Sequence, residues 1–143
     1  MKSNEIIPHN SLIAEMDEKS FNRLLGILPT EEISLVREPH TGLIMMTAND
    51  CFDTDFCIGE ALVTVAEAKI GRVNGFAMIL GDNPNRAIVS ASVDAIMSGH
   101  DEELKSKVQR CLRGYERRAR RHQKHEALLL SSTMVSFENM REG

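Results

Sequence analysis

The feature that most constrains the fold is a change of hydrophobic period near residue 33. From Leu12 to Leu28, apolar residues recur at three- and four-residue steps, which is typical of amphipathic helices. From Ile33 apolar and polar residues alternate, and runs rich in β-forming residues follow one another as far as Leu80. Strands that are grouped together and flanked by helices indicate an α+β fold, since a parallel α/β sheet needs strands that alternate with helices.

The expected order is N-terminal helices, an antiparallel sheet of about four strands, and two further helices. Ser11 to Leu28 predicts two short helices, with Ser20 as the cap of the second. Pro39 to Gly42 predicts a turn between the first two strands. The strands are expected in the runs Ile33 to Glu38, Leu43 to Thr47, Phe56 to Ile70 and Val73 to Leu80, with Asn49 to Asp55 as an exposed loop.

After the sheet, Asn83 and Pro84 are suited to the cap and the first position of a helix that runs to about Met97. Asp101 to Glu103 then begin a long last helix, where acidic residues favour the positive end of the helix dipole. A length of 143 residues fits a single domain, residues 1–143. Residues 133–143 are interpreted as a last short strand or as a free tail that binds a partner.

Charge is distributed unevenly along the chain. The formal net charge is -4, yet residues 104–125 contain nine Lys or Arg and a single acid, Glu116. Five of these cations recur at helical spacing and predict a continuous cationic ridge: Arg110, Arg113, Arg117, Arg121 and Lys124. Another face of the same helix, with Leu104, Val108, Cys111, Tyr115 and Ala119, is expected to pack.

Three uses of the cationic ridge remain open: contact with an acidic protein surface, contact with a phosphorylated substrate held by a neighbour, or simple solvation. Nucleic acid is a weaker candidate, because Tyr115 is the only aromatic residue on the helix that could stack on a base and the overall charge is negative.

The sequence offers little support for catalysis by this chain alone. It contains no GxSxG, P-loop, GxGxxG or HExxH motif. Three cysteines without a CxxC pair, and no secretory or roughly 20-residue apolar segment, predict a reduced, cytoplasmic protein that does not enter a membrane. Cys51 and Cys57 match no common zinc spacing, so no metal is expected. His122 and His125 are interpreted as solvated or partner-facing, because cations surround them.

Three polar positions within the predicted elements call for partners. Arg86, in the turn that begins at Gly81, could bind an anion at a helix N-terminus, although a purely structural cap uses the same residue types. Glu60 is expected to be partly buried and paired with Arg37 on a neighbouring strand. Asp94 poses the same question on its helix, and a structural ion pair is favoured over catalysis in both cases.

The order and spacing of several short motifs resemble the G subunit of the bacterial carbon-phosphorus lyase system, the PhnG family. The resemblance covers residues 25–97 well and continues weakly to the C-terminus. It rests on Arg37 with Thr41-Gly42-Leu43-Ile44-Met45, on Phe56-x-x-Gly59-Glu60-Ala61-Leu62-Val63-Thr64, on Gly75-Phe76-Ala77-Met78 before Gly81, and on Ala87, Ala91 and Asp94-Ala95. The structural or interface candidates that it suggests are Arg37, Gly42, Gly59, Glu60, Thr64 and Asp94.

The resemblance implies a subunit that associates with the H, I and J proteins of that system. Together with H, I and L, such a subunit supports the transfer of the ribose triphosphate part of ATP to an alkylphosphonate, with release of adenine. It carries no cofactor of its own, and ATP is a substrate of the assembled complex. The isolated chain could also form a homodimer.

Two other functions compete with that reading. A stand-alone nucleic-acid-binding module would use the basic helix, residues 104–125. A small independent enzyme would act on an anionic substrate at the turn from Asp82 to Arg86.

Overall fold

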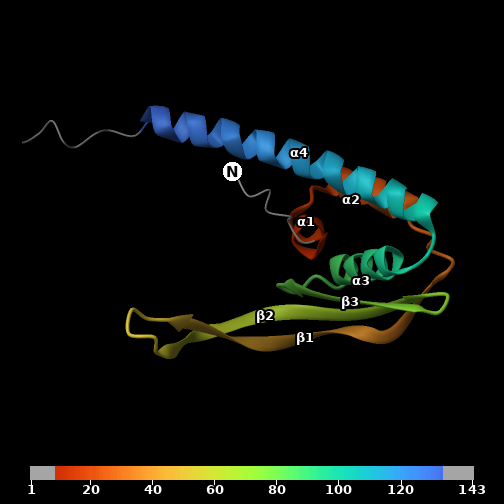
Figure 1. Cartoon of the computed structure of the whole chain (residues 1–143), viewed down its shortest axis with the longest axis horizontal. Helices are drawn as coiled ribbons and strands as arrows, with labels where there is room; N and C mark the ends of the chain where they lie inside the picture. The colour runs from red at the N-terminus through yellow and green to blue at the C-terminus, as the bar shows by residue number, and fades with distance from the viewer. Residues whose placement is uncertain (1–8, 134–143) are drawn as a thin grey trace, which may run out of the picture.

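The structure is a computed structural model that describes residues 9–133 (Figure 1). Two short helices, α1 (His9–Glu15) and α2 (Glu18–Ile27), precede the sheet. The sheet contains β1 (Ile33–Asn49), β2 (Asp55–Ile70) and β3 (Val73–Leu80). Two helices follow, α3 (Pro84–Ser98) and the 32-residue α4 (Glu102–Thr133). The α+β prediction is therefore confirmed, including the long basic last helix. The C-terminal tail falls outside the described residues from residue 134 on.

The sheet has three strands in the order β1-β2-β3, and not about four, because the first two expected strands form one. The turn predicted at Pro39 to Gly42 is wrong: these residues lie inside β1. The pairing of β1 with β2 shifts between Leu35 and Arg37 and again between Arg37 and His40. Proline is tolerated at a bulge on an edge strand, where its missing N–H leaves no ladder bond unmade, so the strand bends here without ending.

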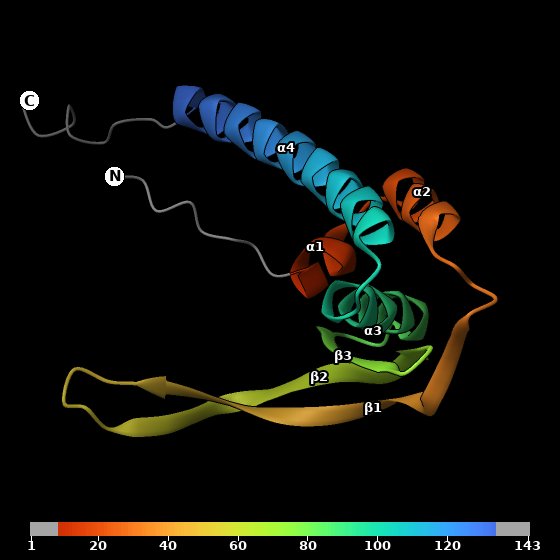
Figure 2. The same cartoon turned by 45° about the vertical axis from the view of Figure 1, so that its right-hand side comes forward.

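Helix α3 covers one face of the sheet, and the other helices lie beyond it (Figures 1 and 2). The contact between α3 and the sheet is made by small buried residues: Ala66, Ala68, Ala77, Ala87 and Ala91. Gly75 on β3 allows this close approach, because a Cβ atom there would collide with the backbone at Ala91 and lie 2.9 Å from the Cβ of Ala95. The small side chains therefore fix how near the helix lies to the sheet.

The opposite side of α3 faces a second core, which the helices share. Its fully buried members come from all four helices and from the link between α1 and α2: Ile13, Met16, Leu24, Val93 and Val108. Leu112 of α4 is 2% exposed and belongs to the same cluster. The packing face predicted for the last helix is thus confirmed at Leu104, Val108, Cys111 and Tyr115, all of which lie in or against this core.

The helix caps differ in detail from those expected. Asp17, and not Ser20, caps α2, and its carboxylate accepts a hydrogen bond from the Ser20 N–H at 3.2 Å. Ser20 is instead buried in the first turn of α2, where its hydroxyl accepts a hydrogen bond from Arg118 of α4. Pro84 begins α3 as predicted, but the Asn83 side chain makes no capping hydrogen bond. Sequence spacing alone did not show which of the neighbouring residues Asp17 and Ser20 caps α2.

Candidate interaction surfaces

The turn between β3 and α3 is held together by Thr64 of β2. The Thr64 hydroxyl donates to the Gly81 carbonyl at 2.6 Å and accepts from the Asn83 N–H at 3.0 Å. Thr64 is only 1% exposed, so both bonds lie out of water. This residue therefore has a structural role: it ties the end of β3 and the start of α3 to the central strand.

Arg86 leaves the turn and reaches α1. Its guanidinium donates to the Ile13 carbonyl at 2.7 Å, lies 3.6 Å from a carboxylate oxygen of Glu18, and stacks 4.8 Å from the centre of the Phe21 ring. A guanidinium used in this way stabilises the last turn of α1, whose carbonyls have no helical partner. These contacts agree with a structural role for the turn. They also direct the Arg86 guanidinium toward α1 and α2, away from the position where an anion could bind at the start of α3.

The expected pair of Glu60 and Arg37 does not form. Glu60 lies opposite Met45, whereas Arg37 lies opposite Glu67, and both Glu60 and Arg37 are exposed. The prediction failed because it assumed that all of β2 is covered, and the part that contains Glu60 is not.

Asp94 makes a hydrogen bond and not the ion pair considered from the sequence. Its carboxylate accepts from the Phe76 N–H at 2.9 Å. Phe76 lies on β3, which is an edge strand of the sheet within residues 9–133. Asp94 thus satisfies an edge donor and attaches α3 to the sheet.

The cationic ridge of Arg110, Arg113, Arg117, Arg121 and Lys124 is exposed along its whole length. It lies on the side of α4 opposite Val108 and Leu112, which are buried. None of the five makes an ion pair with another residue between 9 and 133; the ion pairs of α4 use other cations, such as Arg120 with Glu116 at 2.6 Å.

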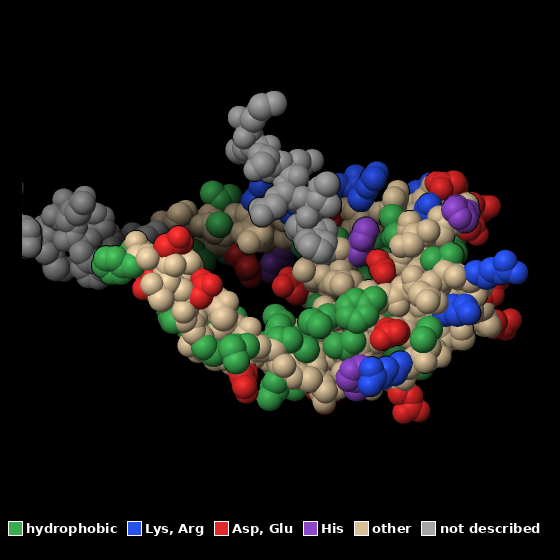
Figure 3. Space-filling model, turned by 60° about the horizontal axis from the view of Figure 1, so that its bottom comes forward, with side chains coloured by type: hydrophobic (Ala, Val, Ile, Leu, Met, Phe, Trp, Pro, Cys, Tyr) green, Lys and Arg blue, Asp and Glu red, His purple; other side chains and the backbone are tan. Residues whose placement is uncertain are grey.

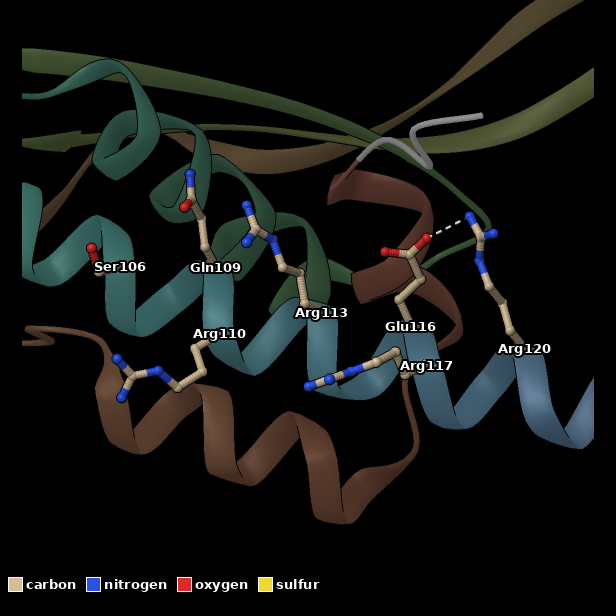
Figure 4. Close-up of a pocket in the computed structure, with 7 residues that line it drawn as sticks. All are labelled: Ser106, Gln109, Arg110, Arg113, Glu116, Arg117 and Arg120. Carbon is tan, nitrogen blue, oxygen red and sulfur yellow. Dashed lines mark hydrogen bonds and ion pairs between the residues drawn. The ribbon is translucent and has the colours of Figure 1, made fainter. Parts of the chain in front are cut away.

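A shallow groove of about 590 Å³ runs beside the ridge and is lined by α4 alone. Figure 4 shows Arg110, Arg113 and Arg117 extending along the helix surface, while a dashed line joins Glu116 to Arg120. One exposed helix cannot enclose a small molecule, since small-molecule sites bury most of the ligand surface. This surface is therefore suited to docking and not to enclosed chemistry.

A second groove separates α4 from α2, and its polar side chains are occupied in holding the helices together. The Tyr115 hydroxyl donates to the Glu15 carbonyl at 2.9 Å, and Arg118 donates to the Ser20 hydroxyl at 3.2 Å. Burial raises the pKa of Tyr115 and of the neighbouring Cys111 thiol above their usual values. A thiol with a raised pKa is a poorer nucleophile at neutral pH, because less of it is ionised.

The most unusual surface was not recognised from the sequence. β1 and β2 extend well beyond the last residue of β3, and the extension, residues 43–62, is here called the arm (Figure 1). Most of its large apolar side chains are exposed: Leu43, Ile44, Met45, Met46, Phe52, Phe56, Ile58 and Leu62. A two-stranded hairpin is marginally stable in water on its own, and a contiguous apolar surface of this kind is typical of a binding site.

The geometry of the arm depends on local features that the sequence does show. The Asp50 carboxylate accepts from the Phe52 N–H at 2.8 Å and from the Thr54 N–H at 2.9 Å, which closes the tip as an Asx turn. Gly59 has a φ of 155°, a conformation that favours glycine, beside the register shift between Met46 and Thr47. The sequence did contain a clue to the arm. The expected strand from Phe56 to Ile70 is much longer than the strand from Val73 to Leu80 that pairs with it, so part of the longer strand has no partner there.

Gly42 and Gly59 were expected at an interface or in a structural role. Both lie on the hairpin with open space around them, and neither makes room for another part of this chain within the described residues. Among residues 9–133 there is no group of three or more His, Cys, Asp or Glu side chains that could hold a metal ion, and no helix long and apolar enough to cross a membrane.

Comparison with known proteins agrees with the resemblance seen in the sequence motifs. The model of one protein family, described as phosphonate metabolism protein PhnG, matches residues 9–143. A search among curated proteins found no match. Since the family match spans nearly the whole chain, the protein belongs to the PhnG family and has a role in phosphonate metabolism.

Proposed function

We propose that this chain is a non-catalytic subunit of the carbon-phosphorus lyase core complex. In this role it assists the H, I and L subunits in transferring the ribose triphosphate moiety of ATP to an alkylphosphonate, with release of adenine. The J subunit is a further partner. The observation that carries the proposal is the membership of the PhnG family combined with the exposed apolar arm, a surface typical of a protein that works while bound to others.

The side chains with chemical potential support an accessory role. Arg86 is engaged by α1, the Cys111 thiol has a raised pKa because it is partly buried, and the Tyr115 hydroxyl is bonded to a carbonyl. In the groove between α2 and α4, the Tyr115 hydroxyl bonds to the Glu15 carbonyl and the Ser20 hydroxyl accepts from Arg118. The groove beside the cationic ridge is lined by one helix alone. The chain in this proposal holds no cofactor, and ATP binds to the assembled complex.

The cysteines support a reducing compartment such as the cytoplasm. All three are free thiols, and Cys51 and Cys57 are exposed on the hairpin. Exposed thiols persist where glutathione and thioredoxin keep them reduced.

The proposal is tested by reconstitution. The chain is co-expressed with the I, H and J subunits, purified by a tag on the I subunit, and assayed with the L subunit for adenine released from ATP and methylphosphonate. Leu43→Ser with Met45→Ser on the arm is expected to remove the chain from the complex and to reduce adenine release. Val36→Ser, a matched change at an exposed position of β1 outside the arm, is expected to leave both unchanged.

Adenine release at an equal rate from the H, I and L subunits without this chain would refute the proposed function. Retention of the arm variant in a fully active complex would show that the arm is not the surface that carries assembly.

The alternative of nucleic-acid binding by the basic helix has less support. Tyr115, the one aromatic side chain on α4, is partly buried and bonded to α1, so it is not available to stack on a base. Titration of the chain with single- and double-stranded oligonucleotides at low salt checks this point. Binding that weakens steeply with added salt would restore the alternative.

A further inference from the structure

Two segments of the described chain have little support from the rest of it, apart from the hydrogen bond that Arg118 of α4 donates to Ser20. One is the arm, residues 43–62, in which no third strand accompanies the hairpin. The other is the distal part of α4, residues 117–133, where every side chain from Arg120 on is exposed. Figures 1 and 2 both show these segments extending past the body of the molecule in the same direction. A two-stranded hairpin that stands alone in water is marginally stable, so the arm would gain most from a covering surface.

The two segments have opposite charge. The arm contains four acidic residues and no Lys or Arg; the acids are Asp50, Asp53, Asp55 and Glu60. The distal part of α4 contains five cations and one acid, Glu126; the cations are Arg117, Arg118, Arg120, Arg121 and Lys124. On the face shown in Figure 3, hydrophobic and acidic side chains gather on the projecting hairpin, and blue side chains lie elsewhere.

The two segments also share an apolar component. The arm exposes Leu43 at 63%, Met45 at 67% and Ile58 at 60%. The last turns of α4 expose Leu128, Leu129 and Leu130 to a similar degree. Contact between the segments would therefore remove apolar surface from water on both sides and bring opposite charges together, the combination that gives both affinity and register at an interface.

Within one chain this contact does not form. The sheet lies on one side of α3, and α4 lies on the other side, beyond α1 (Figures 1 and 2). Figure 3 shows open space between the hairpin and the body of the molecule. The layer of helices therefore holds the complementary segments apart, and no other part of residues 9–133 brings them together.

We propose that a second copy of this chain supplies the complementary surface, so that the arm of each copy packs along the distal part of α4 of the other. Each copy carries one arm and one distal helix. In a twofold dimer, both arms and both distal helices are covered at once, because isologous interfaces use the same surfaces of each copy. A standard interface uses roughly 20 to 30 residues on each side. The arm has 20 residues and the distal helix has 17, so the two segments are long enough to supply that number. The inference concerns the isolated chain and does not rest on the proposed function.

A charge-swap experiment on the full chain tests the pairing. In the arm variant, Asp55→Lys and Glu60→Lys make the arm basic; in the helix variant, Arg117→Glu and Arg121→Glu make the distal helix acidic. All four positions are exposed, so the fold is expected to persist, and circular dichroism with thermal melting confirms this for each variant. Arg72→Glu, in the β2–β3 turn at the other end of the sheet, is the matched control.

Analytical ultracentrifugation gives the dissociation constant of each dimer. The parent chain and the Arg72→Glu control are expected to dimerise equally, whereas each variant alone is expected to dissociate at least about tenfold more readily, because like charges then face each other twice. An equimolar mixture of the two variants is expected to dimerise again. In the mixed pair, the basic arm meets the acidic helix and the unaltered arm meets the unaltered helix.

Three results would overturn the inference. The parent chain could remain a monomer at all concentrations, which would assign the arm to a different protein. Either variant could dimerise as tightly as the parent chain. The mixture could fail to recover the dimer although both variants are folded. Each result leaves the adenine-release assay unaffected, so failure of the dimer and failure of the proposed function are distinguishable.

Discussion

The two halves of β2 differ sharply although they belong to one continuous strand. In the half beneath α3, Ala66 is 1% exposed and Ala68 is fully buried, and the side chains are small so that the helix can approach closely. In the half within the arm, Phe56 is 47% and Ile58 is 60% exposed, and the side chains are large. Along β2, small residues thus lie beneath α3, while large apolar residues lie where nothing in the described chain covers them.

This contrast separates residues that stabilise the chain from residues that serve association. Burial of apolar surface stabilises a fold only where the folded chain itself removes that surface from water. Substitutions in the covered half should therefore lower the free energy of unfolding, whereas equal substitutions in the arm should change association alone. The four predictions that follow test this separation, from the largest expected effect to the smallest.

Gly75→Ala should have the largest effect, because the added Cβ meets the backbone of α3 at Ala91 and Ala95, which cannot move without separating the helix from the sheet. We expect a loss of about 4 kcal/mol in the free energy of unfolding, measured by urea denaturation. Gly42→Ala on the hairpin, where a Cβ has open space, is the control and should change stability by less than about 0.5 kcal/mol. Equal stability of the two variants would contradict the close approach of α3.

Ile79→Ala and Met45→Ala compare a covered strand position with one on the arm. Ile79 is 3% exposed and Met45 is 67% exposed. Truncation of the buried side chain should cost about 3 kcal/mol of unfolding free energy, since it leaves a cavity between sheet and helices. Truncation of the exposed one should cost less than about 0.5 kcal/mol in a dilute, monomeric sample. A large loss for Met45→Ala under those conditions would show that the arm packs against its own chain.

Thr64→Val should lower stability by about 2 kcal/mol, because it removes the donor to Gly81 and leaves the Asn83 N–H without its acceptor in a buried place. The shape of the side chain is nearly unchanged, so thermal melting reports the lost hydrogen bonds. Thr47→Val, at an exposed position of the arm, supplies the same chemical change without a buried partner. A neutral result for Thr64→Val would mean that water replaces both bonds.

Asp17 should give the smallest effect, visible only in acid. Hydrogen bonding by the Ser20 side chain, supported by the Ser20 N–H, lowers the pKa of the Asp17 carboxyl below its ordinary value of 3.8. A lowered pKa means that the folded state favours the ionised form, so the stabilisation is present above the ordinary pKa and is lost as the pH falls through the lower, folded value. Asp17→Asn keeps the capping acceptor but does not titrate. Stability of the parent chain should therefore fall more between about pH 5 and pH 2 than that of the variant; parallel curves would contradict the cap.

The helices and the class of fold could be predicted from the sequence because their causes are local. The spacing of Leu12 to Leu28, Pro84 at the first position of α3, and the acids that begin α4 act within a few residues of themselves. The cationic ridge also depends on helical spacing alone, and the structure places it opposite Val108 and Leu112 as that spacing requires.

The predictions that failed depended on neighbours distant in the chain. Pro39 predicts a turn when read locally, but the pairing of β1 with β2 continues past it as a bulge. Glu60 was assigned to a covered strand, because periodicity cannot tell whether a third strand or a helix lies beside a given hairpin residue. Ser20 and Asp17 are both good caps, and only the path of the chain decides between them.

The sequence by itself determined the α+β class, the long basic helix and the family, because these depend on periodicity, charge order and motif spacing within the chain. Only the tertiary structure decided that β3 stops short of the hairpin, that Arg86 is directed toward α1, and that the arm is left exposed. The physical reason is that burial depends on which segments meet in space. An apolar run such as Leu43 to Met46 has one sequence pattern, and that pattern does not show whether the same chain or another molecule covers the run.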